Sequence, residues 1–260
     1  MPPATGPADA GVGRARVAFV TGAARGLGAS IASALLRDGC RVVFADSDPT
    51  VIATAAAAAS AGAAATRAAA EIVDVRDRAA VGAALDATVA RFGSLDILVN
   101  NAALTIRRTV WEIEADEWDT VMAVNLRGVL FGCQIAGAQM RRRGWGRIVN
   151  LASYAGQQPS PASGAHYAVS KAGVLMLTKV FAQELAASGV TVNAVSPSAI
   201  AGPHLDALPP AQAEALRATI PAGRFGEADD VCAAVRYLVS DSAGYVTGAT
   251  LDVNGGRGMR

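Results

Sequence analysis

The stretch TGAARGLG (21–28) follows the apolar run RVAFVT (16–21) and decides the fold. Gly22, Gly26 and Gly28 allow the backbone to turn tightly and to approach a ligand closely. The helix expected next offers free N–H groups and a positive dipole end to a diphosphate. The spacing G-x-x-x-G-x-G differs from the G-x-G-x-x-G fingerprint, and a glycine-rich turn alone can be a simple tight connection. Its place between a strand and a helix favours a dinucleotide site.

Apolar, β-branched runs recur between longer segments that have helical composition. Most are apolar throughout, as expected for parallel strands that helices cover on both faces. Such alternation with right-handed crossovers predicts a doubly wound parallel sheet. The length of 260 residues suits one large α/β domain, and no linker-like segment divides the chain. The predicted strands are residues 16–21, 41–46, 71–75, 95–100, 147–152, 190–195 and 250–253.

Three other segments have distinctive composition. Residues 1–13 are rich in Pro, Gly and Ala and lack the pattern of a signal peptide, so we predict a disordered N-terminal tail. The alanine-rich residues 53–70 predict a surface helix. MRRRG (140–144) predicts a helix C-terminus, with arginines at the negative dipole end and a glycine stop.

Composition excludes several classes of protein. Hydrophobic residues make up 52%, which excludes disorder of the whole chain, and a net charge of +1 argues against a nucleic-acid or acidic-membrane partner. No segment is expected to approach a membrane span of about 20 apolar residues. Cys40, Cys133 and Cys232 indicate buried thiols in a reducing compartment, and with His166 and His204 they form no metal-site spacing. We therefore expect a cytoplasmic protein without a bound metal.

Tyr167 and Lys171 stand out in the otherwise small and apolar run GAHYAVSKAG (164–173). Residues four apart on a helix share a face, so the phenol and the ammonium are expected to point the same way. The pair alone is also consistent with a lysine that lies along the surface beside a packed tyrosine. Asp46, which ends the second predicted strand, has the distance from the glycine turn expected of an acid that binds ribose hydroxyls.

Taken together, these motifs resemble the short-chain dehydrogenase/reductase family over roughly residues 14–256. The resemblance implies a single Rossmann-type doubly wound α/β domain at residues 14–260, with a seven-stranded parallel sheet flanked by helices. It also implies a nicotinamide cofactor and redox chemistry between a secondary alcohol and a ketone. The motifs that carry it, in family order, are TGAARGLG, Asp74–Val75, NNA (100–102), Asn125, Ser153, and Tyr167 with Lys171.

By this resemblance Tyr167 is the general acid/base, and Ser153 hydrogen-bonds the substrate oxygen. Lys171 binds the nicotinamide ribose and lowers the pKa of the tyrosine, while Asn125 holds a water that links Lys171 to solvent. A phenolate at pH 7 costs about 4 kcal/mol, and a nearby cation can supply part of that. His166 is given no catalytic role. The implied cofactor-binding residues are Gly22, Arg25, Gly26, Leu27, Gly28, Asp46, Asp74, Val75, Asn101, Ala102, Tyr167, Lys171, Pro197 and Ile200.

The chain departs from the family pattern at three positions. Ala103 replaces the glycine of NNAG, Ser198 replaces the glycine of Pro-Gly after the sixth strand, and Gly202 replaces a threonine. The last two put in doubt the hydrogen bonds to the nicotinamide carboxamide, although the backbone of Ile200 can still contact it. The loop between Ser153 and Tyr167 is one residue longer than the commonest form.

Two residues favour different cofactors, one NAD and the other NADP. Arg25 resembles the basic residue that pairs with the 2′-phosphate in NADP-dependent relatives, and Asp46 resembles the acid that binds both ribose hydroxyls in NAD-dependent ones. A phosphate placed against a strand-end carboxylate is repelled. Arg25 can turn to solvent or pair with Asp46. We therefore predict NAD, with NADP less favoured.

Other functions remain open at the level of sequence. One is a reductase of 3-oxoacyl groups on acyl carrier protein, for which Arg107 and Arg108 could form part of a docking patch. Another is a dinucleotide-sensing protein without turnover. Residues 203–225 follow the sixth strand and predict a mobile lid over a small alcohol or ketone substrate. The helix at 126–140 is apolar on nearly every face, which together with the resemblance predicts a homotetramer.

Overall fold

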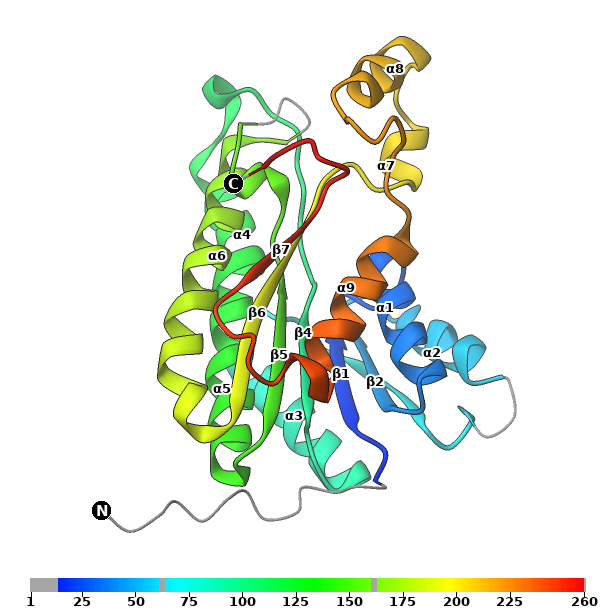
Figure 1. The fold of residues 1–260 in the computed structure, drawn as a ribbon, viewed down its shortest axis with the longest axis vertical. Coiled ribbons are helices and arrows are strands. Elements are labelled where there is room, and N and C mark those ends of the chain that lie inside the picture. The colour runs from blue at the N-terminus through cyan, green and yellow to red at the C-terminus, as the bar shows by residue number, and fades with distance from the viewer. Residues whose placement is uncertain (1–13, 61–63, 160–162, 260) are drawn as a thin grey trace.

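A computed structural model describes residues 14–60, 64–159 and 163–259. The predicted tail at 1–13 lies outside these residues. In the described chain, the strands form one seven-stranded sheet with the order β3-β2-β1-β4-β5-β6-β7, and all six neighbouring pairs are parallel. The predicted seven-stranded, doubly wound sheet is confirmed (Figure 1). Its strands are β1 (Val17–Thr21), β2 (Arg41–Asp46), β3 (Ala68–Ile72), β4 (Ile97–Asn100), β5 (Gly146–Leu151), β6 (Val190–Pro197) and β7 (Thr250–Val253).

Helices cover both faces of the sheet, which explains why the strands are apolar throughout. In β1, Ala18 and Val20 join one buried cluster, whereas Val17 and Phe19 join the other. The first cluster lies under α1, α2 and α9, and the second under α3, α5 and α6 (Figure 1). The helices are α1 (Gly26–Arg37), α2 (Val51–Ala59), α3 (Arg78–Phe92), α4 (Ala115–Met122), α5 (Gly128–Arg143), α6 (Ala165–Leu185), α7 (Pro203–Asp206), α8 (Pro210–Ala218) and α9 (Ala228–Val239), with short turns η2 (Val110–Glu112), η3 (Ala123–Arg127), η4 (Tyr154–Gly156), η5 (Ala186–Ser188) and η6 (Asp241–Ala243).

The alanine-rich segment differs from the prediction. The helix α2 ends at Ala59, and β3 begins at Ala68 rather than at residue 71. Ala68 and Ala69 are buried and pair with Val42 and Val43 of β2. Alanine favours a helix only weakly, and pairing with a buried neighbouring strand overrides that preference. By contrast, the helix predicted to end near residue 144 does so, because Gly144 adopts φ +73° after Arg143.

One continuous helical segment, residues 115–143, joins α4, η3 and α5. By length and composition it is apolar enough to cross a membrane, so the expectation that no segment would approach a span was wrong. Half of its most apolar window is buried inside the protein. Val129, Cys133 and Met140 of the same segment are also buried. Core helices pass the same test of length and composition, and the α5 part of this segment packs on β4 and β5, beside α3 and α6.

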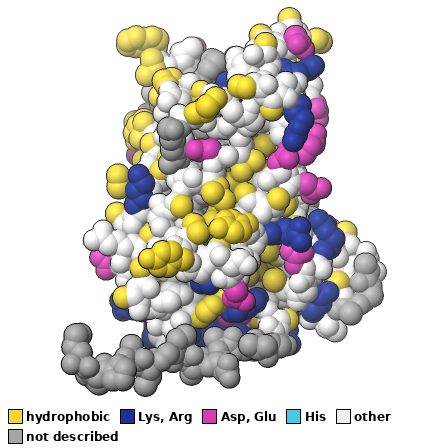
Figure 2. Space-filling model, in the orientation of Figure 1, with side chains coloured by type: hydrophobic (Ala, Val, Ile, Leu, Met, Phe, Trp, Pro, Cys, Tyr) yellow, Lys and Arg dark blue, Asp and Glu magenta, His cyan; other side chains and the backbone are white. Residues whose placement is uncertain are grey.

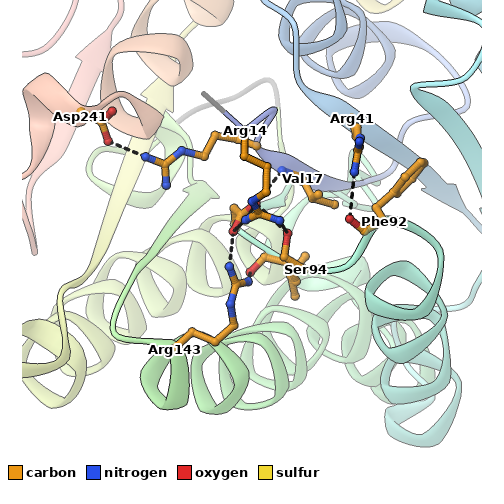
Figure 3. A network of polar contacts seen from close by, with 10 residues as sticks. Arg14, Val17, Arg41, Phe92, Ser94, Arg143 and Asp241 are labelled. Carbon is orange, nitrogen blue, oxygen red and sulfur yellow. Dashed lines mark hydrogen bonds and ion pairs between the residues drawn. The ribbon is translucent and has the colours of Figure 1, made fainter. Parts of the chain in front are cut away.

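A buried carboxylate fixes the end of the sheet opposite the strand carboxyl ends. The side chain of Asp96 accepts hydrogen bonds from Arg14 at 3.0 Å, Arg143 at 2.8 Å and the backbone N–H of Val17 at 2.8 Å (Figure 3). Ser94 donates a further hydrogen bond to it. A buried charge is tolerated when it is paired and hydrogen-bonded in this way. The network therefore locks the start of β1 against β4 and the end of α5.

Acidic and basic side chains are mixed on the molecular face that Figure 2 shows. Arg224 pairs with Asp230 at 2.8 Å, and Arg236 pairs with Asp38. Paired charges of this kind leave no field of a single sign over that region, as the net charge of +1 suggests.

Candidate active site

The glycine turn after β1 has the geometry of a phosphate cradle. Gly22 and Gly26 adopt φ +67° and +57°, in the left-handed region that favours glycine. A Cβ on Gly22 would lie 2.8 Å from the Cα of Ala102, and one on Gly28 would collide with the carbonyl of Gly22. No described side chain caps the N-terminus of α1. Its free N–H groups and close backbone approach therefore fit the diphosphate of a dinucleotide.

A threonine at the end of β1 joins this turn to the loop after β4. The Oγ1 of Thr21 accepts hydrogen bonds from the backbone N–H groups of Asn101 at 2.9 Å and Ala102 at 3.0 Å. The side-chain amide of Asn101 donates to the carbonyl of Gly22 at 3.1 Å. The predicted cofactor residues Asn101 and Ala102 thus hold the two loops together at the cofactor cradle.

The acid at the end of β2 is held in place by backbone groups. The two carboxylate oxygens of Asp46 accept hydrogen bonds from the N–H groups of Ala24 at 2.9 Å and Asp48 at 3.0 Å. Arg25 pairs with Asp48 at 2.7 Å, and its side chain is 81% exposed. Of the two outcomes left open by the sequence, Arg25 thus turns toward solvent rather than toward Asp46. A fixed carboxylate therefore stands beside the cradle.

Asp74 and Val75 lie just after β3. The carboxylate of Asp74 pairs with Arg76 at 2.6 Å, and hydrogen bonds from Arg76 hold the pKa of Asp74 below its usual value. The side chain of Val75 packs so closely on Gly128 that a Cβ there would lie 2.9 Å from it. Val75 thus packs against the start of α5, and the cofactor contacts predicted for Asp74 and Val75 stay predictions.

Tyr167 and Lys171 lie one turn apart on α6, and the Nζ of Lys171 is 5.7 Å from the centroid of the tyrosine ring. The alternative of a surface lysine is wrong, because Lys171 is only 2% exposed. Its Nζ donates a hydrogen bond to the carbonyl of Leu151 at 2.7 Å, and burial lowers its pKa to about 8. An ammonium is buried here at the carboxyl end of β5.

The phenol of Tyr167 is hydrogen-bonded by the side chains of Ser153 and Thr105. Burial raises the pKa of Tyr167, and these two hydrogen bonds act in the opposite direction. The loss of hydration thus outweighs the two hydrogen bonds, and the lowering of this pKa by Lys171 together with a bound cofactor stays a prediction. The arrangement keeps a protonated phenol beside a hydroxyl group.

Asn125 lies in η3, a π-helical turn between α4 and α5. Its Oδ1 accepts a hydrogen bond from the N–H of Leu104 at 2.7 Å, and its Nδ2 donates to the Leu104 carbonyl at 2.9 Å and to Ser170 at 3.1 Å. Both ends of the amide bind protein groups, and the predicted role of Asn125 in holding a water stays a prediction. Asn125 ties the loop after β4 to α6.

Tyr167, Lys171 and Ser153 line one cavity of about 530 Å³ at the carboxyl ends of the strands. Leu27, Asn101, Pro197 and Ile200, which were predicted to bind the cofactor, line the same cavity. A larger cavity of about 870 Å³ adjoins it and shares Arg107 and Ala155 with it. We place the chemistry in the smaller cavity, because the phenol and the ammonium face it.

The three departures from the family pattern are also found near this cavity. Ala103 and Ser198 line it, and Ser198 accepts a hydrogen bond from Arg257 at 3.1 Å. Gly202 precedes α7, where its carbonyl accepts the N–H of Leu205. The side chain of Leu205 lines the cavity as well. The segment after β6 thus covers the site, as predicted for residues 203–225.

Several site residues were not predicted from the sequence. Thr21 and Thr105 are single threonines in loops, and Ser170 is one of many serines, so no local pattern singles them out. Arg257 lies at the end of the chain, far from every motif. His166, given no catalytic role, is buried, binds Glu117 at 3.1 Å through Nε2 and accepts the N–H of Tyr167 at Nδ1.

Residues 22–257 match a protein-family model of the short-chain dehydrogenases described as enoyl-(acyl carrier protein) reductase. The chain belongs to the short-chain dehydrogenase/reductase family. This membership confirms the resemblance drawn from its motifs. The chain is accordingly an oxidoreductase that uses NAD or NADP and acts on alcohol and keto groups.

Relatives within the short-chain dehydrogenase/reductase family differ in substrate. The chain is 41% identical over 244 residues to the 3-oxoacyl-(acyl-carrier-protein) reductase FabG of Staphylococcus aureus, covering 93% of this chain and 98% of that protein. It is 39% identical over 243 residues to 2-dehydro-3-deoxy-L-rhamnonate dehydrogenase (NAD(+)) of a Sphingomonas species, covering 93% and 95%. The solved structure of levodione reductase is 33% identical and has a TM-score of 0.88, covering 93% and 97%.

Proposed function

We propose that Tyr167 is the general acid/base of this enzyme and that it interconverts a secondary alcohol and a ketone. The observation that carries the proposal is the half-buried Tyr167, whose phenol is hydrogen-bonded to Ser153 and Thr105 and lies one helical turn from a buried ammonium. A nicotinamide cofactor, when bound, supplies or accepts the hydride. In reduction, the Oη of Tyr167 donates its proton to the carbonyl oxygen, which the hydroxyl of Ser153 also binds.

Lys171 supports this proton transfer through its charge. With a pKa of about 8, its ammonium is mostly protonated at neutral pH. A positive charge near the phenol stabilises the phenolate that remains after the proton has left. By its place on the same helix face, Lys171 also lies where it can hydrogen-bond the ribose of a nicotinamide nucleotide in this cavity. We therefore assign it both roles.

Substitution of the tyrosine tests the proposal. Tyr167→Phe keeps the ring and removes only the proton donor, so cofactor binding should persist while turnover falls by about 100-fold or more, the usual worth of a positioned acid. The measurement is NADH and NADPH consumption with a panel of ketones, together with cofactor binding by fluorescence. A variant that keeps more than a few per cent of the wild-type kcat contradicts the assignment.

For the cofactor we propose NAD rather than NADP. Asp46 is fixed by two backbone hydrogen bonds at the end of β2, and Asp48 stands next to it. Arg25, the residue that would favour a 2′-phosphate, already pairs with Asp48. A phosphate with roughly two negative charges would approach two carboxylates and one neutralised cation, and that arrangement repels it.

A second candidate is reduction of 3-oxoacyl groups on acyl carrier protein. It is favoured by the 41% identity to the reductase of Staphylococcus aureus and by the exposed Arg107 at the junction of the two cavities. Arg108 is less available, because it pairs with Glu117 at 3.2 Å. Rates on a 3-oxoacyl carrier protein and on the same acyl group on N-acetylcysteamine separate the two functions. A carrier-dependent gain that Arg107→Glu removes would support the second.

We also propose a cytoplasmic location, for which the support is the state of the cysteines. Cys40, Cys133 and Cys232 are free thiols, and burial raises the pKa of Cys133 to about 12. Free, unreactive thiols are usual in reducing compartments. Fractionation of the producing cell with detection by antibody tests this proposal, and recovery in the secreted or membrane fraction would contradict it.

A further inference from the structure

Arg257 is held by a defined turn after β7. The side chain of Asn254 accepts the N–H of Gly256 at 2.9 Å and donates to the carbonyl of Gly258 at 2.8 Å. The N–H of Arg257 donates to the carbonyl of Asn254 at 3.1 Å. Gly255 and Gly256 adopt φ +62° and +83°, which a side chain would strain. The turn therefore presents Arg257 in a fixed direction.

The guanidinium of Arg257 lies in the same cavity as the catalytic groups. It stacks on Tyr154, with Cζ at 4.6 Å from the ring centroid, and Nη1 donates to the Oγ of Ser198 at 3.1 Å. Tyr154 directly follows Ser153, and Arg257, Ser153 and Tyr167 all line the 530 Å³ cavity. The charge is therefore placed beside the position of the reacting carbonyl.

This positive charge has no carboxylate beside it in the part of the chain that the structure describes. None of the described side chains that line the cavity is Asp or Glu, and Arg107 adds a second arginine at its mouth. Leucines from the covering segment, Leu205, Leu208 and Leu216, form an apolar wall. A partly buried guanidinium against such a wall gains most from an anionic partner that can bind it in a planar fork.

Ser198 provides independent support. It stands where the family pattern commonly has glycine, and its hydroxyl is the group that accepts the hydrogen bond from Arg257. A glycine there would have no side chain to orient the guanidinium. The departure at Ser198 is therefore explained by the placement of Arg257, on two segments that are far apart in sequence.

We propose that Arg257 binds a carboxylate of the substrate, so that the preferred substrates are short oxo acids and the corresponding hydroxy acids. This inference rests on the proposed function of Tyr167, because it concerns the substrate of the same cavity. The space is small and shared with the nicotinamide, so the carboxylate and the reacting carbon are separated by only a few bonds. Ser198 and Tyr154 are positioning residues for the guanidinium.

Matched pairs of acids and esters test the inference. The probes are 3-oxobutanoate, 4-oxopentanoate and 5-oxohexanoate, each beside its methyl ester, with NADH and NADPH as cofactors. For wild type, at least one acid should have a kcat/KM about tenfold or more above its own ester. Arg257→Ala should remove that advantage mainly through KM, by about 10- to 100-fold, as expected when hydrogen bonds to a charged group are lost.

Further variants separate charge, orientation and general damage. Arg257→Lys keeps the charge but not the fork, so it should retain part of the preference for the acid. Ser198→Gly should weaken the preference for the acid, because the guanidinium is no longer oriented, and should change kcat/KM for the ester less. Arg142→Ala, which removes an exposed arginine in the last turn of α5, is the matched control and should leave the ratio of acid to ester as in wild type.

The two hypotheses fail in different ways. Esters reduced as fast as acids by wild type, or an acid-to-ester ratio that Arg257→Ala does not change, would overturn the role of Arg257 while the proposed function stands. If the enzyme oxidises no cofactor with any of the probes, the role of Arg257 is tested by binding. Calorimetry then measures the affinity of the three acids for the enzyme saturated with NADH. Binding that Arg257→Ala weakens by about tenfold supports the inference, and no binding, or binding that it does not weaken, overturns it.

Discussion

At the scale of single residues, the fixed carboxylate of Asp46 sets the first prediction. We expect kcat/KM with NADH to exceed that with NADPH by about tenfold or more at equal substrate, which needs only about 1.4 kcal/mol. Asp46→Ala should lower the ratio of kcat/KM with NADH to that with NADPH, because the repulsion of the 2′-phosphate is removed. Arg25→Ala is the control and should change the ratio little, since the arginine is 81% exposed and already paired. Equal or better efficiency with NADPH in wild type would refute the preference.

The raised pKa of Tyr167 gives a prediction about pH. Burial keeps the phenol protonated at neutral pH, so the proton needed for reduction is present there. Oxidation of the alcohol requires the phenolate, so its rate should rise with pH through the alkaline range. The rate of ketone reduction requires the protonated phenol and should fall in that same range, but not at neutral pH. The measurement is kcat in both directions between about pH 6 and 10. An oxidation rate that does not change over that range would contradict the role of the phenol.

The residues of the candidate site differed in how far they could be predicted. Tyr167 and Lys171 lie four residues apart, so a helix alone places them together. Thr105 of the loop after β4 reaches the site through Tyr167 of α6, and Ser170 of α6 through Asn125 of η3, and no local pattern encodes these contacts. For the same reason, the sequence could not show that the amide of Asn125 is taken up by Leu104. Residue types at fixed spacing were predictable, but tertiary partners were not.

At the scale of elements, α7 and α8 stand beyond the end of the sheet (Figure 1). Leu205 of α7, Leu216 of α8 and Leu208 between the two helices line the cavity. The place of this segment was predicted, and its mobility stays a prediction. We expect amide hydrogens of residues 205–219 to exchange more slowly when cofactor and substrate are both bound, because closure excludes water. Hydrogen exchange with mass spectrometry measures this, and the buried strand β5 serves as the internal reference. Unchanged exchange in the segment would argue against a lid.

The elements themselves show which sequence signals sufficed. The boundaries of β2 and β7 were predicted without error, because turn residues bound each apolar run. The alanines before residue 71 misled the prediction, since alanine suits a helix and gives no strand signal, yet Ala68 and Ala69 pair with β2. The pairing with the neighbouring strand β2 therefore decides between helix and strand for these alanines.

At the scale of the whole molecule, the chain brings its C-terminal turn back to a site built mainly from its first two thirds. The motifs predicted a parallel doubly wound sheet and the position of the cavity, because parallel strands gather their carboxyl ends at one edge. They gave no indication of Arg257, since its contacts with Ser198 and Tyr154 join three segments that are distant in sequence. Substrate preference is thus determined by residues that lie outside the motifs.

The prediction of a homotetramer also concerns the whole molecule. Val169, Met176 and Val180 are 46%, 59% and 48% exposed on one face of α6, where burial against a second copy would be favourable. A cavity of about 650 Å³ between α5 and α6, lined by Leu126, Leu130 and Met176, continues this apolar face. We expect light scattering at micromolar concentration to give roughly four times the mass of the 26.3 kDa chain.

Two variants locate the interface. Met176→Glu places a charge in the apolar face and should shift the mass toward dimer or monomer, because a charge buried without a partner is costly. Ile52→Glu makes the same change at a side chain that is 55% exposed on α2, on the opposite face of the sheet, and should leave the tetramer intact. A monomeric wild type would refute the assembly. Equal sensitivity to the two variants would instead show that α6 is not its interface.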